Sequence, residues 1–351
     1  MPHSSSGTRG AGARRPPGAP PARSAVAAIC FVCAAGALLA GCTGPQSSLD
    51  PAGRDAARIA ELFTVMTVGA AIVWVAVVGL TLYASRTGRR AHSPRFTRGL
   101  IVIGGVVVPV FVLGALLVYG LAPLPDVLAL PQRGGLTIAV TGEQWWWRVR
   151  YQPADGPPFE LANEIRLPVG RRIELQLESA DVIHAFWLPS LAGKMDLVPG
   201  RTNRLAIEPT RTGVFRGACA EYCGLSHANM AFYAVVLEED EFEQWMRAQA
   251  REAQAPASEL TARGQAAFVA HGCGACHAVR GTEARGVIGP DLTHLGSRLS
   301  IGAGIRRNHP GELQTWIQAT GHVKPGVRMP PYDMLPGDEV RALAAYLTEL
   351  R

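Results

Sequence analysis

Three apolar runs occupy the first third of the chain and define its organisation. Residues 25–40 are apolar over about the length of a signal-peptide core, and the segment before them carries four arginines and no acidic residue. Residues 62–83 and 100–121 are each 22 residues long and carry no charge. Each can cross a hydrocarbon core of about 30 Å as a helix, which favours two transmembrane helices over two buried helices of a soluble protein.

The loop between the two predicted spans indicates their orientation. Residues 84–99 carry five arginines and no acidic residue, and loops of this kind lie on the cytoplasmic side of a membrane. Both helix ends away from the loop then face the outside. Everything after residue 122 is therefore expected to be extracytoplasmic.

After residue 135 the pattern changes to short, β-rich segments separated by Gly and Pro, which predicts a β-sandwich or a small barrel. The clearest strand candidates are residues 136–140, 172–177, 203–207 and 231–237. An acidic run precedes a predicted helix at 242–251, and residues 252–258 have the composition of a short flexible linker. Residues 259–271 and 337–350 have helical periodicity, which predicts an all-α C-terminal domain.

Length and charge narrow the function classes. At 351 residues the chain is too long for one ordinary domain, and with 18% charged residues it is not expected to be disordered. The net charge is +6, but residues 1–121 carry 11 Lys and Arg against 3 acidic residues, whereas residues 122–257 carry 13 against 17. The basic excess lies beside the predicted spans, where it determines orientation, so nucleic-acid binding is not expected.

The first apolar run ends in Leu-Ala-Gly-Cys42, which resembles the lipobox of bacterial lipoproteins. The resemblance implies cleavage before Cys42 and lipidation of its thiol on the outer face of the cytoplasmic membrane. An ordinary signal peptide with an incidental cysteine is the alternative. The predicted parts are a signal peptide at 1–41, a two-span segment at 42–121, a β domain at 122–251, the linker at 252–258 and a helical domain at 259–351.

Four of the seven cysteines form two pairs whose spacing suits metal or cofactor attachment. The first pair, Cys219 and Cys223, lies in the segment CAEYCGLSHANM, which also contains His227 and Met230, and His184 is a distant candidate partner. Thiolates, imidazoles and a thioether favour copper over magnesium or calcium. The two cysteines and two histidines alone would equally suit structural zinc. Met230 favours copper, because a thioether is a common weak axial copper ligand.

This segment, together with DVIHAFWLPSLAGKMDLVPGR at 181–201 and GEQWWW at 142–147, resembles subunit II of bacterial and mitochondrial cytochrome c oxidases over roughly residues 60–250. The resemblance implies two membrane helices and a cupredoxin-type domain with a dinuclear copper centre, CuA. The implied ligands are Cys219 and Cys223 as bridges, His184 and His227 with one copper each, and Met230 and the backbone carbonyl of Glu221 as axial ligands.

The resemblance also implies roles for single residues beside the copper. The Glu221 side chain resembles the residue that meets a magnesium or manganese ion at the contact with subunit I. Trp145 matches the position at which electrons enter, an exposed indole near the copper, whereas Trp147 is expected to fill the sandwich core. Glu143 departs from the family, because many relatives have histidine there, and no consequence for the copper is evident.

The second cysteine pair lies in Cys273-Gly-Ala-Cys276-His277, the C-x-x-C-H pattern of haem c attachment. Both thiols add to haem vinyl groups, and His277 becomes the proximal iron ligand. A thioredoxin-like C-x-x-C is the alternative, but it would follow a strand and would leave His277 without a role. The helical pattern at 262–271 and the extracytoplasmic location both favour haem.

The sixth iron ligand should be a methionine or histidine from the other side of the haem. The candidates are Met329, Met334, His294, His309 and His322. The segment 316–330, which ends in Met329-Pro330, resembles the methionine loop of small cytochromes c and favours Met329. Residues 288–292 resemble the loop that supports the proximal histidine, so residues 258–351 are similar to a complete cytochrome c domain.

Together these resemblances imply a multidomain membrane protein with a two-helix transmembrane hairpin, an all-β cupredoxin-type domain and an all-α cytochrome c domain. The implied function is electron transfer from haem c to CuA, then to haem a and the haem–copper site of subunit I, where oxygen is reduced to water and protons are translocated. The electron donor would be a cytochrome bc complex or a soluble cytochrome c. The metal domains would lie on the periplasmic face of the bacterial cytoplasmic membrane.

Two other functions remain open from the residues alone. One is a CuA-containing subunit of a nitric oxide reductase. The other is a membrane-tethered electron carrier or copper-delivery protein without an enzymatic partner.

Overall fold

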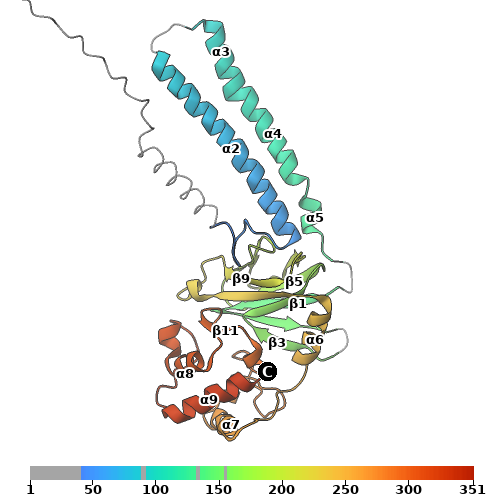
Figure 1. The fold of residues 1–351 in the computed structure, drawn as a ribbon, viewed down its shortest axis with the longest axis vertical. Coiled ribbons are helices and arrows are strands. Elements are labelled where there is room, and N and C mark those ends of the chain that lie inside the picture. Colours follow the sequence, from blue (N-terminus) through green and yellow to red (C-terminus); the bar gives the residue numbers. More distant parts are fainter. Residues whose placement is uncertain (1–40, 88–91, 132–134, 154–155) are drawn as a thin grey trace, which may run out of the picture. The chain divides into compact units, whose positions relative to one another are not determined.

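The structure, a computed structural model, describes residues 41–87, 92–131, 135–153 and 156–351. Residues 45–351 belong to one unit, in which a helical hairpin precedes the globular part (Figure 1). The predicted signal peptide lies outside the described residues, apart from residue 41. The lipidation of Cys42 stays a prediction.

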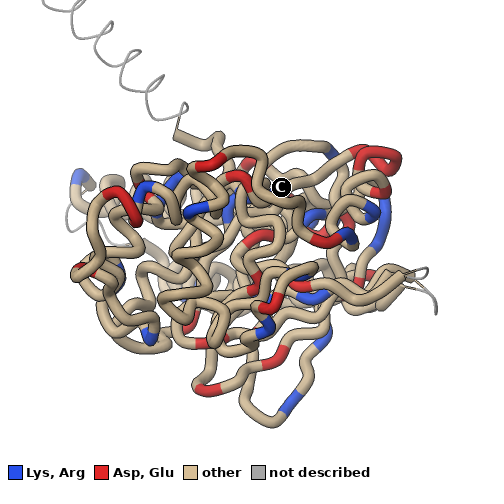
Figure 2. Tube along the Cα trace, turned by 90° about the horizontal axis from the view of Figure 1, so that it is seen from below, with Lys and Arg blue, Asp and Glu red and all other residues tan. Residues whose placement is uncertain are grey.

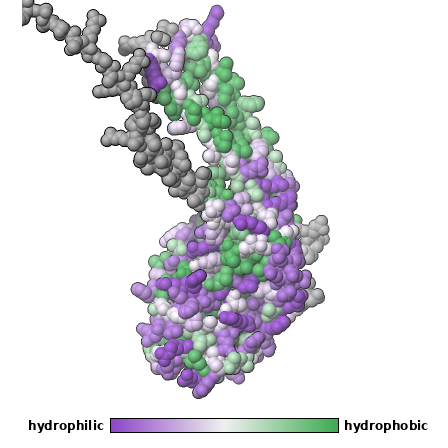
Figure 3. Space-filling model, viewed as in Figure 1, coloured by the Kyte–Doolittle hydropathy of each residue, from purple (hydrophilic) through white to green (hydrophobic). Residues whose placement is uncertain are grey.

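Two apolar helices precede the globular part of the chain. Helix α2 spans Arg54–Thr87, and the second span begins at Pro94 and ends at Leu128. The second span consists of α3 (Pro94–Val102), the π-helical turn η1 (Ile103–Val107), α4 (Val108–Leu121) and α5 (Leu124–Leu128). At 34 and 35 residues both are long and apolar enough to cross a membrane, and hydrophobic side chains gather on them (Figure 3). Both extend beyond the runs predicted from the sequence.

The hairpin is anchored to the β domain at both of its ends. Before α2, the amide of Ala52 donates to the carbonyl of Ser190 at 2.6 Å. The next residue, Gly53, has no room for a side chain, because a Cβ there would lie 2.1 Å from the carbonyl oxygen of Leu191. After α5, Arg172 donates to the carbonyls at the end of that helix, including that of Asp126 at 3.0 Å. These contacts connect the membrane helices directly to the domain that carries the copper candidates.

The β domain is a sandwich of two five-stranded sheets, so the sandwich rather than the barrel is correct. One sheet has the order β3-β2-β1-β5-β8, with strands β1 (Thr137–Glu143), β2 (Trp146–Tyr151), β3 (Phe159–Ala162), β5 (Ile173–Ser179) and β8 (Asn203–Ile207). The other has the order β4-β10-β9-β6-β7, with strands β4 (Glu164–Pro168), β6 (His184–Trp187), β7 (Lys194–Leu197), β9 (Gly213–Cys219) and β10 (Ala231–Leu237).

Alternate residues of the strands point into the sandwich core, as the period of a strand requires. Trp147 is fully buried there, with its ring 5.6 Å from that of Phe186 and 5.5 Å from that of Phe232. Trp147 is therefore a core residue, as predicted. Helix α6 (Glu239–Gln249) closes one end of the sandwich through Trp245, whose ring contacts that of Tyr151.

The C-terminal domain is helical. Acidic and basic positions alternate along the trace of the folded chain and do not gather in one region (Figure 2). It contains α7 (Glu259–Ala270), η3 (Cys273–Ala275), η4 (Leu295–Ser297), β11 (Ser300–Ile301), β12 (Arg306–Arg307), α8 (Pro310–Val323) and α9 (Gly337–Glu349). Ser258 and Thr261 form a capping box at the start of α7. Helices α7 and α9 cross at Gly264, where a Cβ would lie 2.0 Å from the carbonyl oxygen of Ala342.

The segment predicted as a flexible linker is held against the C-terminal domain. The amide of Ala253 donates to the carbonyl of Arg280 at 2.9 Å, and the amide of Ala257 donates to Glu349 Oε1 at 2.6 Å. Ala253 also packs against the core of this domain. Hydrogen bonds to groups distant in sequence therefore restrain the backbone of this segment, and its bounds as a linker stay a prediction.

Candidate functional site

The predicted copper ligands converge at one end of the sandwich. Strand β9 ends at Cys219, β6 begins at His184, and the turn η2 (His227–Asn229) presents His227 just before Met230. The sulfur atoms of Cys219 and Cys223 are 3.8 Å apart. His184 Nδ1 lies 3.9 Å from Cys219 Sγ, and His227 Nδ1 lies 3.5 Å from Cys223 Sγ. Each sulfur therefore has one imidazole beside it.

Two weaker donors complete this cluster. Met230 Sδ lies 3.7 Å from Cys223 Sγ, and the carbonyl oxygen of Glu221 lies 3.2 Å from Cys219 Sγ. Met230 is only 1% exposed, so its thioether faces the sulfur cluster within the protein. The Glu221 side chain is exposed, and its predicted contact with a magnesium or manganese ion stays a prediction.

The electrostatics of the two sulfurs fit positive charge bound beside them. The hydrogen bond with Cys223 lowers the pKa of Cys219, with a further contribution from His184. The same contact, together with burial, raises the pKa of Cys223. One thiolate forms readily, but a second negative charge 3.8 Å away requires positive charge beside it. Soft cations between the sulfurs would supply that charge, and the buried thioether favours copper over zinc.

Asp181 fixes the orientation of His184. Its Oδ1 lies 2.8 Å from His184 Nε2, and its Oδ2 accepts from the backbone amide of Gln144 at 2.8 Å. A proton on Nε2 leaves Nδ1, the nitrogen that faces Cys219, free to bind a metal, and a carboxylate in this position also raises the basicity of the ring. Gly142 gives the ring space, because a Cβ there would lie 2.8 Å from His184 Cδ2.

Trp145 differs from the exposed indole that the resemblance implies, since only 8% of its surface is accessible. Its Nε1 donates to the carbonyl of Cys223 at 2.9 Å, which places the ring against the copper loop. Its own carbonyl accepts from Lys324 Nζ of the C-terminal domain at 2.6 Å. A Cβ on Gly326 would lie 2.7 Å from the indole. Trp145 is buried because the C-terminal domain covers it.

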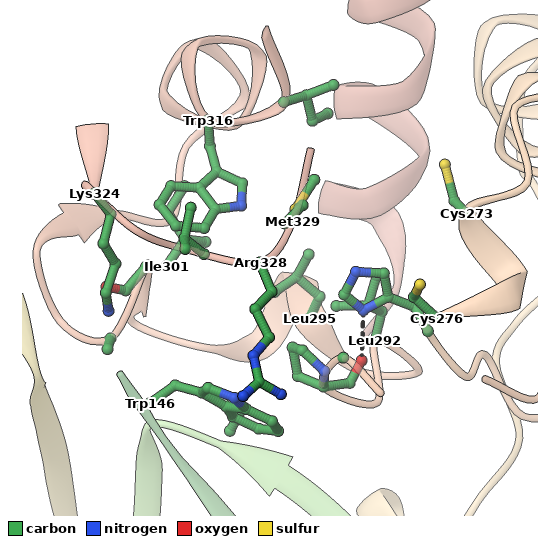
Figure 4. Close-up of a pocket in the computed structure, with 18 of the residues that line it drawn as sticks. Trp146, Cys273, Cys276, Leu292, Leu295, Ile301, Trp316, Lys324, Arg328 and Met329 are labelled. Atoms are coloured by element: carbon green, nitrogen blue, oxygen red, sulfur yellow. Dashed lines mark hydrogen bonds between the residues drawn. The ribbon is translucent and has the colours of Figure 1, made fainter. Parts of the chain in front are cut away.

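The second candidate site is a cavity of about 230 Å³ lined mainly by the C-terminal domain. Cys273, Cys276, His277 and Met329 are among the residues that line it (Figure 4). Protein interiors contain few voids larger than a water molecule. A cavity of this size beside a C-x-x-C-H motif therefore fits a covalently attached haem.

The loop at 288–292 supports His277, as the resemblance implies. His277 Nδ1 lies 2.8 Å from the carbonyl oxygen of Pro290, which leaves Nε2 free to bind iron. Burial lowers the pKa of His277, and the ring stays in the neutral form that binds metals. Gly289 is needed at this contact, because a Cβ there would lie 2.5 Å from His277 Cε1.

Arg298 supplies an independent sign of a hydrogen-bond acceptor in the cavity. The residue lines the cavity and is 6% exposed, and one of its guanidinium nitrogens donates to the carbonyl of Asp291. Its Nε has no hydrogen-bond partner among the described residues. Buried donors are almost always paired, so this nitrogen fits an acceptor such as a haem carboxylate.

The cavity distinguishes the five candidates for the sixth iron ligand. Met329 lines it, whereas Met334, His294, His309 and His322 do not. Met334 is 71% exposed, and His294 Nε2 lies 3.1 Å from the carbonyl oxygen of Arg251. The position of Met329 therefore supports its assignment as the methionine ligand.

The β domain supplies one wall of this cavity, which the sequence reasoning did not foresee. Its residues there include Glu143, Gln144, Trp146 and Asn163. Glu143, at the position where many relatives have histidine, forms an ion pair with Arg148 at 2.6 Å. The guanidinium of Arg148 also lies 4.7 Å from the centre of the Trp146 ring. The only signal in the sequence was the resemblance that places Trp145 near the copper, and no pattern in GEQWWW indicates that its neighbours line the haem cavity.

Hydrogen bonds connect the two domains around the copper loop. Lys324 Nζ bonds to both domains, because it donates to the carbonyl of Trp145 in the β domain and to that of Gly302 in its own domain at 2.9 Å. Further contacts are Ser226 Oγ to Pro325 O at 2.6 Å, Ala231 N to Ala303 O at 3.0 Å, Leu299 N to Glu164 Oε2 at 2.8 Å and an Arg148 nitrogen to Val287 O at 3.0 Å. Ser226 precedes His227 and Ala231 follows Met230, so the C-terminal domain touches the metal-binding loop itself.

Comparisons with known proteins give matches for both domains. Residues 153–238 match the family profile described as cytochrome c oxidase subunit II, periplasmic domain, and residues 261–351 match cytochrome c. Cytochrome c oxidase subunit 2 of Alkalihalophilus pseudofirmus is 34% identical over 326 residues, which cover 89% of this chain and 94% of that protein. Cytochrome c oxidase subunit 2 of Bacillus subtilis is 29% identical over 343 residues, which cover 90% and 94%.

A similar solved structure is the periplasmic domain of subunit II of cytochrome oxidase from Bradyrhizobium japonicum. It is 37% identical and covers 34% of this chain and 96% of its own, with a TM-score of 0.32.

Proposed function

This chain belongs to the cytochrome c oxidase subunit II family, and from that premise we propose that it passes electrons from its own haem c to a dinuclear CuA centre. The family implies copper in the β domain and haem c in the C-terminal domain. When bound, each of the two cofactors carries one electron at a time. The residues of the protein hold, orient and shield the cofactors.

In the C-terminal domain, Cys273 and Cys276 would attach the haem and His277 would bind the iron through Nε2. The contact of His277 with Pro290 supports this geometry. Met329 would bind on the other side, because it lines the same cavity. The free Nε of Arg298 would hold a carboxylate of the haem.

In the β domain, the thiolates of Cys219 and Cys223 and the imidazoles of His184 and His227 would hold the copper pair. Met230 and the carbonyl of Glu221 would be weaker donors to it. The ligand atoms of His184, Cys219 and Cys223 all lie within 4.8 Å of one another, whereas His227 lies beside Cys223 outside that group, which supports two metal positions over one. Asp181 would hold His184 in the tautomer that the metal needs.

One observation carries the proposal: the wall of the haem cavity and the copper loop are joined by direct hydrogen bonds. Gln144 and Trp145 line the cavity, and both donate to the carbonyl of the predicted ligand Cys223, at 2.8 and 2.9 Å. An electron leaving the cavity therefore reaches a copper ligand without crossing solvent. Trp145 therefore stays the proposed point of electron entry to the copper, but the electron would come from the fused C-terminal domain and not from a soluble cytochrome c.

Beyond this chain, we propose that electrons continue to haem a and the haem–copper site of subunit I, where oxygen is reduced to water and protons are translocated. The exposed Glu221 would meet a magnesium or manganese ion at that contact. A cytochrome bc complex or soluble cytochrome c would reduce haem c. Both metal domains would lie on the periplasmic face of the bacterial cytoplasmic membrane, with Cys42 lipidated there.

Flash photoreduction of haem c in the detergent-solubilised full chain tests the transfer. Because both domains belong to one chain and are docked, copper reduction should be first-order, independent of protein concentration and only weakly sensitive to salt. A rate that increases in proportion to protein concentration would show that the electron passes between molecules.

Substitution of either bridging cysteine tests the copper assignment. Cys219→Ser and Cys223→Ser should each abolish the mixed-valent signal in the EPR spectrum, because both thiolates are needed to bridge two coppers. The haem absorption spectrum should persist, since attachment depends on other cysteines. An unchanged two-copper signal in either variant would remove that cysteine from the ligand set.

A further inference from the structure

Gln144 lies between the haem cavity and the copper cluster. It lines the cavity, and its Nε2 donates to the carbonyl oxygen of Cys223 at 2.8 Å. Its backbone amide donates to Asp181 Oδ2 at 2.8 Å, and Asp181 Oδ1 lies 2.8 Å from His184 Nε2. One residue therefore reaches two predicted copper ligands, one from each side of the cluster.

A glycine permits this close approach. Gly224 directly follows Cys223 and has a φ of +115°, a conformation that favours glycine. A Cβ there would lie 3.1 Å from Gln144 Nε2 and 3.3 Å from Trp145 Nε1. Any side chain at this position would crowd both donors to the Cys223 carbonyl.

Trp145 shares only one of the two connections. Its Nε1 also donates to the Cys223 carbonyl, but among the described residues it has no hydrogen bond to Asp181 or His184. Gln144 thus differs from its neighbour by holding both the cysteine side and the histidine side of the cluster.

We propose that Gln144 is a positioning residue that holds Cys223 and His184 and, through its amide hydrogen bond, couples haem c electronically to the copper pair. The inference rests on the proposed function. In the step concerned, one electron would pass from reduced haem c to the oxidised copper pair. No covalent bond would form or break, and no proton would move.

The physical basis is the short connection from the cavity to a metal ligand. From the Gln144 side chain the route crosses one hydrogen bond and then the covalent bonds of Cys223 to its sulfur. Partners that hydrogen-bond to metal ligands orient those ligands and tune the metal, and their loss costs about tenfold to a hundredfold in affinity or activity. Loss of this donor should therefore change both the copper spectrum and the transfer rate.

The test variant is Gln144→Glu in the full-length protein with both cofactors bound. The carboxylate has the shape of the amide but no N–H, so the bond to the Cys223 carbonyl is lost while the backbone bond to Asp181 remains. The matched control is Asn163→Asp, the same chemical change on the same cavity wall. Asn163 Oδ1 accepts from the amide of Trp147 at 2.8 Å, which a carboxylate also does, and it has no hydrogen bond to a copper ligand among the described residues.

Two readouts are followed, the hyperfine pattern of the copper EPR spectrum and the rate of copper reduction after flash photoreduction of haem c. Gln144→Glu should shift the hyperfine pattern and slow the transfer by about tenfold or more. Asn163→Asp should keep the wild-type EPR pattern and slow the transfer much less. Gln144→Leu, which lacks both the donor and the added charge, should reproduce the slowing.

Equal rates in Gln144→Glu and Asn163→Asp would overturn the inference, as would a wild-type rate in Gln144→Leu. If Asn163→Asp does not retain both cofactors, the transfer rate of Gln144→Leu relative to the wild type decides whether the inference holds. A wild-type protein without a copper pair or without covalent haem would overturn the proposed function instead, which separates the two failures.

Discussion

Met329 and Met334 lie in one loop, and their surroundings show how a single residue acquires a role. Met329 lines the haem cavity, whereas Met334 is 71% exposed. The hydroxyl of Thr320, a residue with no exposed surface, donates to the carbonyl of Met329 at 2.9 Å and fixes the loop at this point. The chemistry of the two side chains is identical, so position alone makes Met329 the iron ligand in our proposal.

Met329→Leu should retain covalent haem but lose the methionine-to-iron charge-transfer absorption band. The reduction potential of the haem should also fall, because a thioether ligand raises it. Visible absorption spectra and a redox titration of the purified protein measure both effects. Met334→Leu is the matched control and should behave as the wild type; the reverse pattern would identify Met334 as the ligand.

At the scale of elements, the cytochrome c domain depends on the crossing of α7 and α9. A Cβ on Gly264 would lie 2.0 Å from the carbonyl oxygen of Ala342, so the two backbones are in direct contact. The C-x-x-C-H motif begins three residues after α7 ends. The crossing therefore determines where the attachment cysteines stand relative to the cavity.

Gly264→Ala should destabilise the domain by about 1–3 kcal/mol, because overpacking against rigid backbone forces α9 to shift. Gly321→Ala is the matched control: Gly321 lies in α8, and a Cβ there meets nothing within 4 Å. That change should be neutral or stabilise by up to about 1 kcal/mol, since alanine loses less entropy than glycine in a helix. Haem absorbance during thermal unfolding measures both, and equal effects would contradict the close crossing.

At the scale of the whole molecule, a buried lysine joins the two domains. Lys324 is 2% exposed, and its Nζ donates to one carbonyl of each domain, Trp145 at 2.6 Å and Gly302 at 2.9 Å. Burial lowers the pKa of Lys324 to about 7. The chain has one other lysine, Lys194, which is exposed. The reactivities of the buried Lys324 and the exposed Lys194 can therefore be compared to measure whether the domains stay docked.

Acylation of amines, followed by mass spectrometry, should modify Lys194 quickly and Lys324 slowly. The difference should be on the order of tenfold or more, because an opening that costs about 1.4 kcal/mol leaves a tenth of the molecules open. The low pKa of Lys324 would by itself speed its reaction at pH 8, since more of the amine is uncharged than in an ordinary lysine. Slow reaction therefore reports burial, and equal rates at the two lysines would mean that the domains separate.

The sequence by itself determined the chemistry of this protein and its order along the chain. Two uncharged runs of 22 residues predicted the membrane helices, and CAEYCGLSHANM and C-x-x-C-H predicted the copper and haem sites. The two metal sites can be predicted because the ligands within each motif are neighbours in the chain. The spacing of these residues therefore indicates that they can bind one cofactor together. An all-β domain followed in the same way from alternating strands, but the choice between a sandwich and a barrel did not.

Only the tertiary structure decided how the domains meet. It showed that the expected linker is fixed, that Trp145 is covered, and that Gln144 and Trp146 form a wall of the haem cavity. Lys324 and Trp145 are 179 positions apart in the chain, and no local pattern encodes such a contact. It arises where the surfaces of two folded domains pack together. The shapes of these surfaces and the positions of their buried donors and backbone carbonyls must match, and they exist only once both domains have folded.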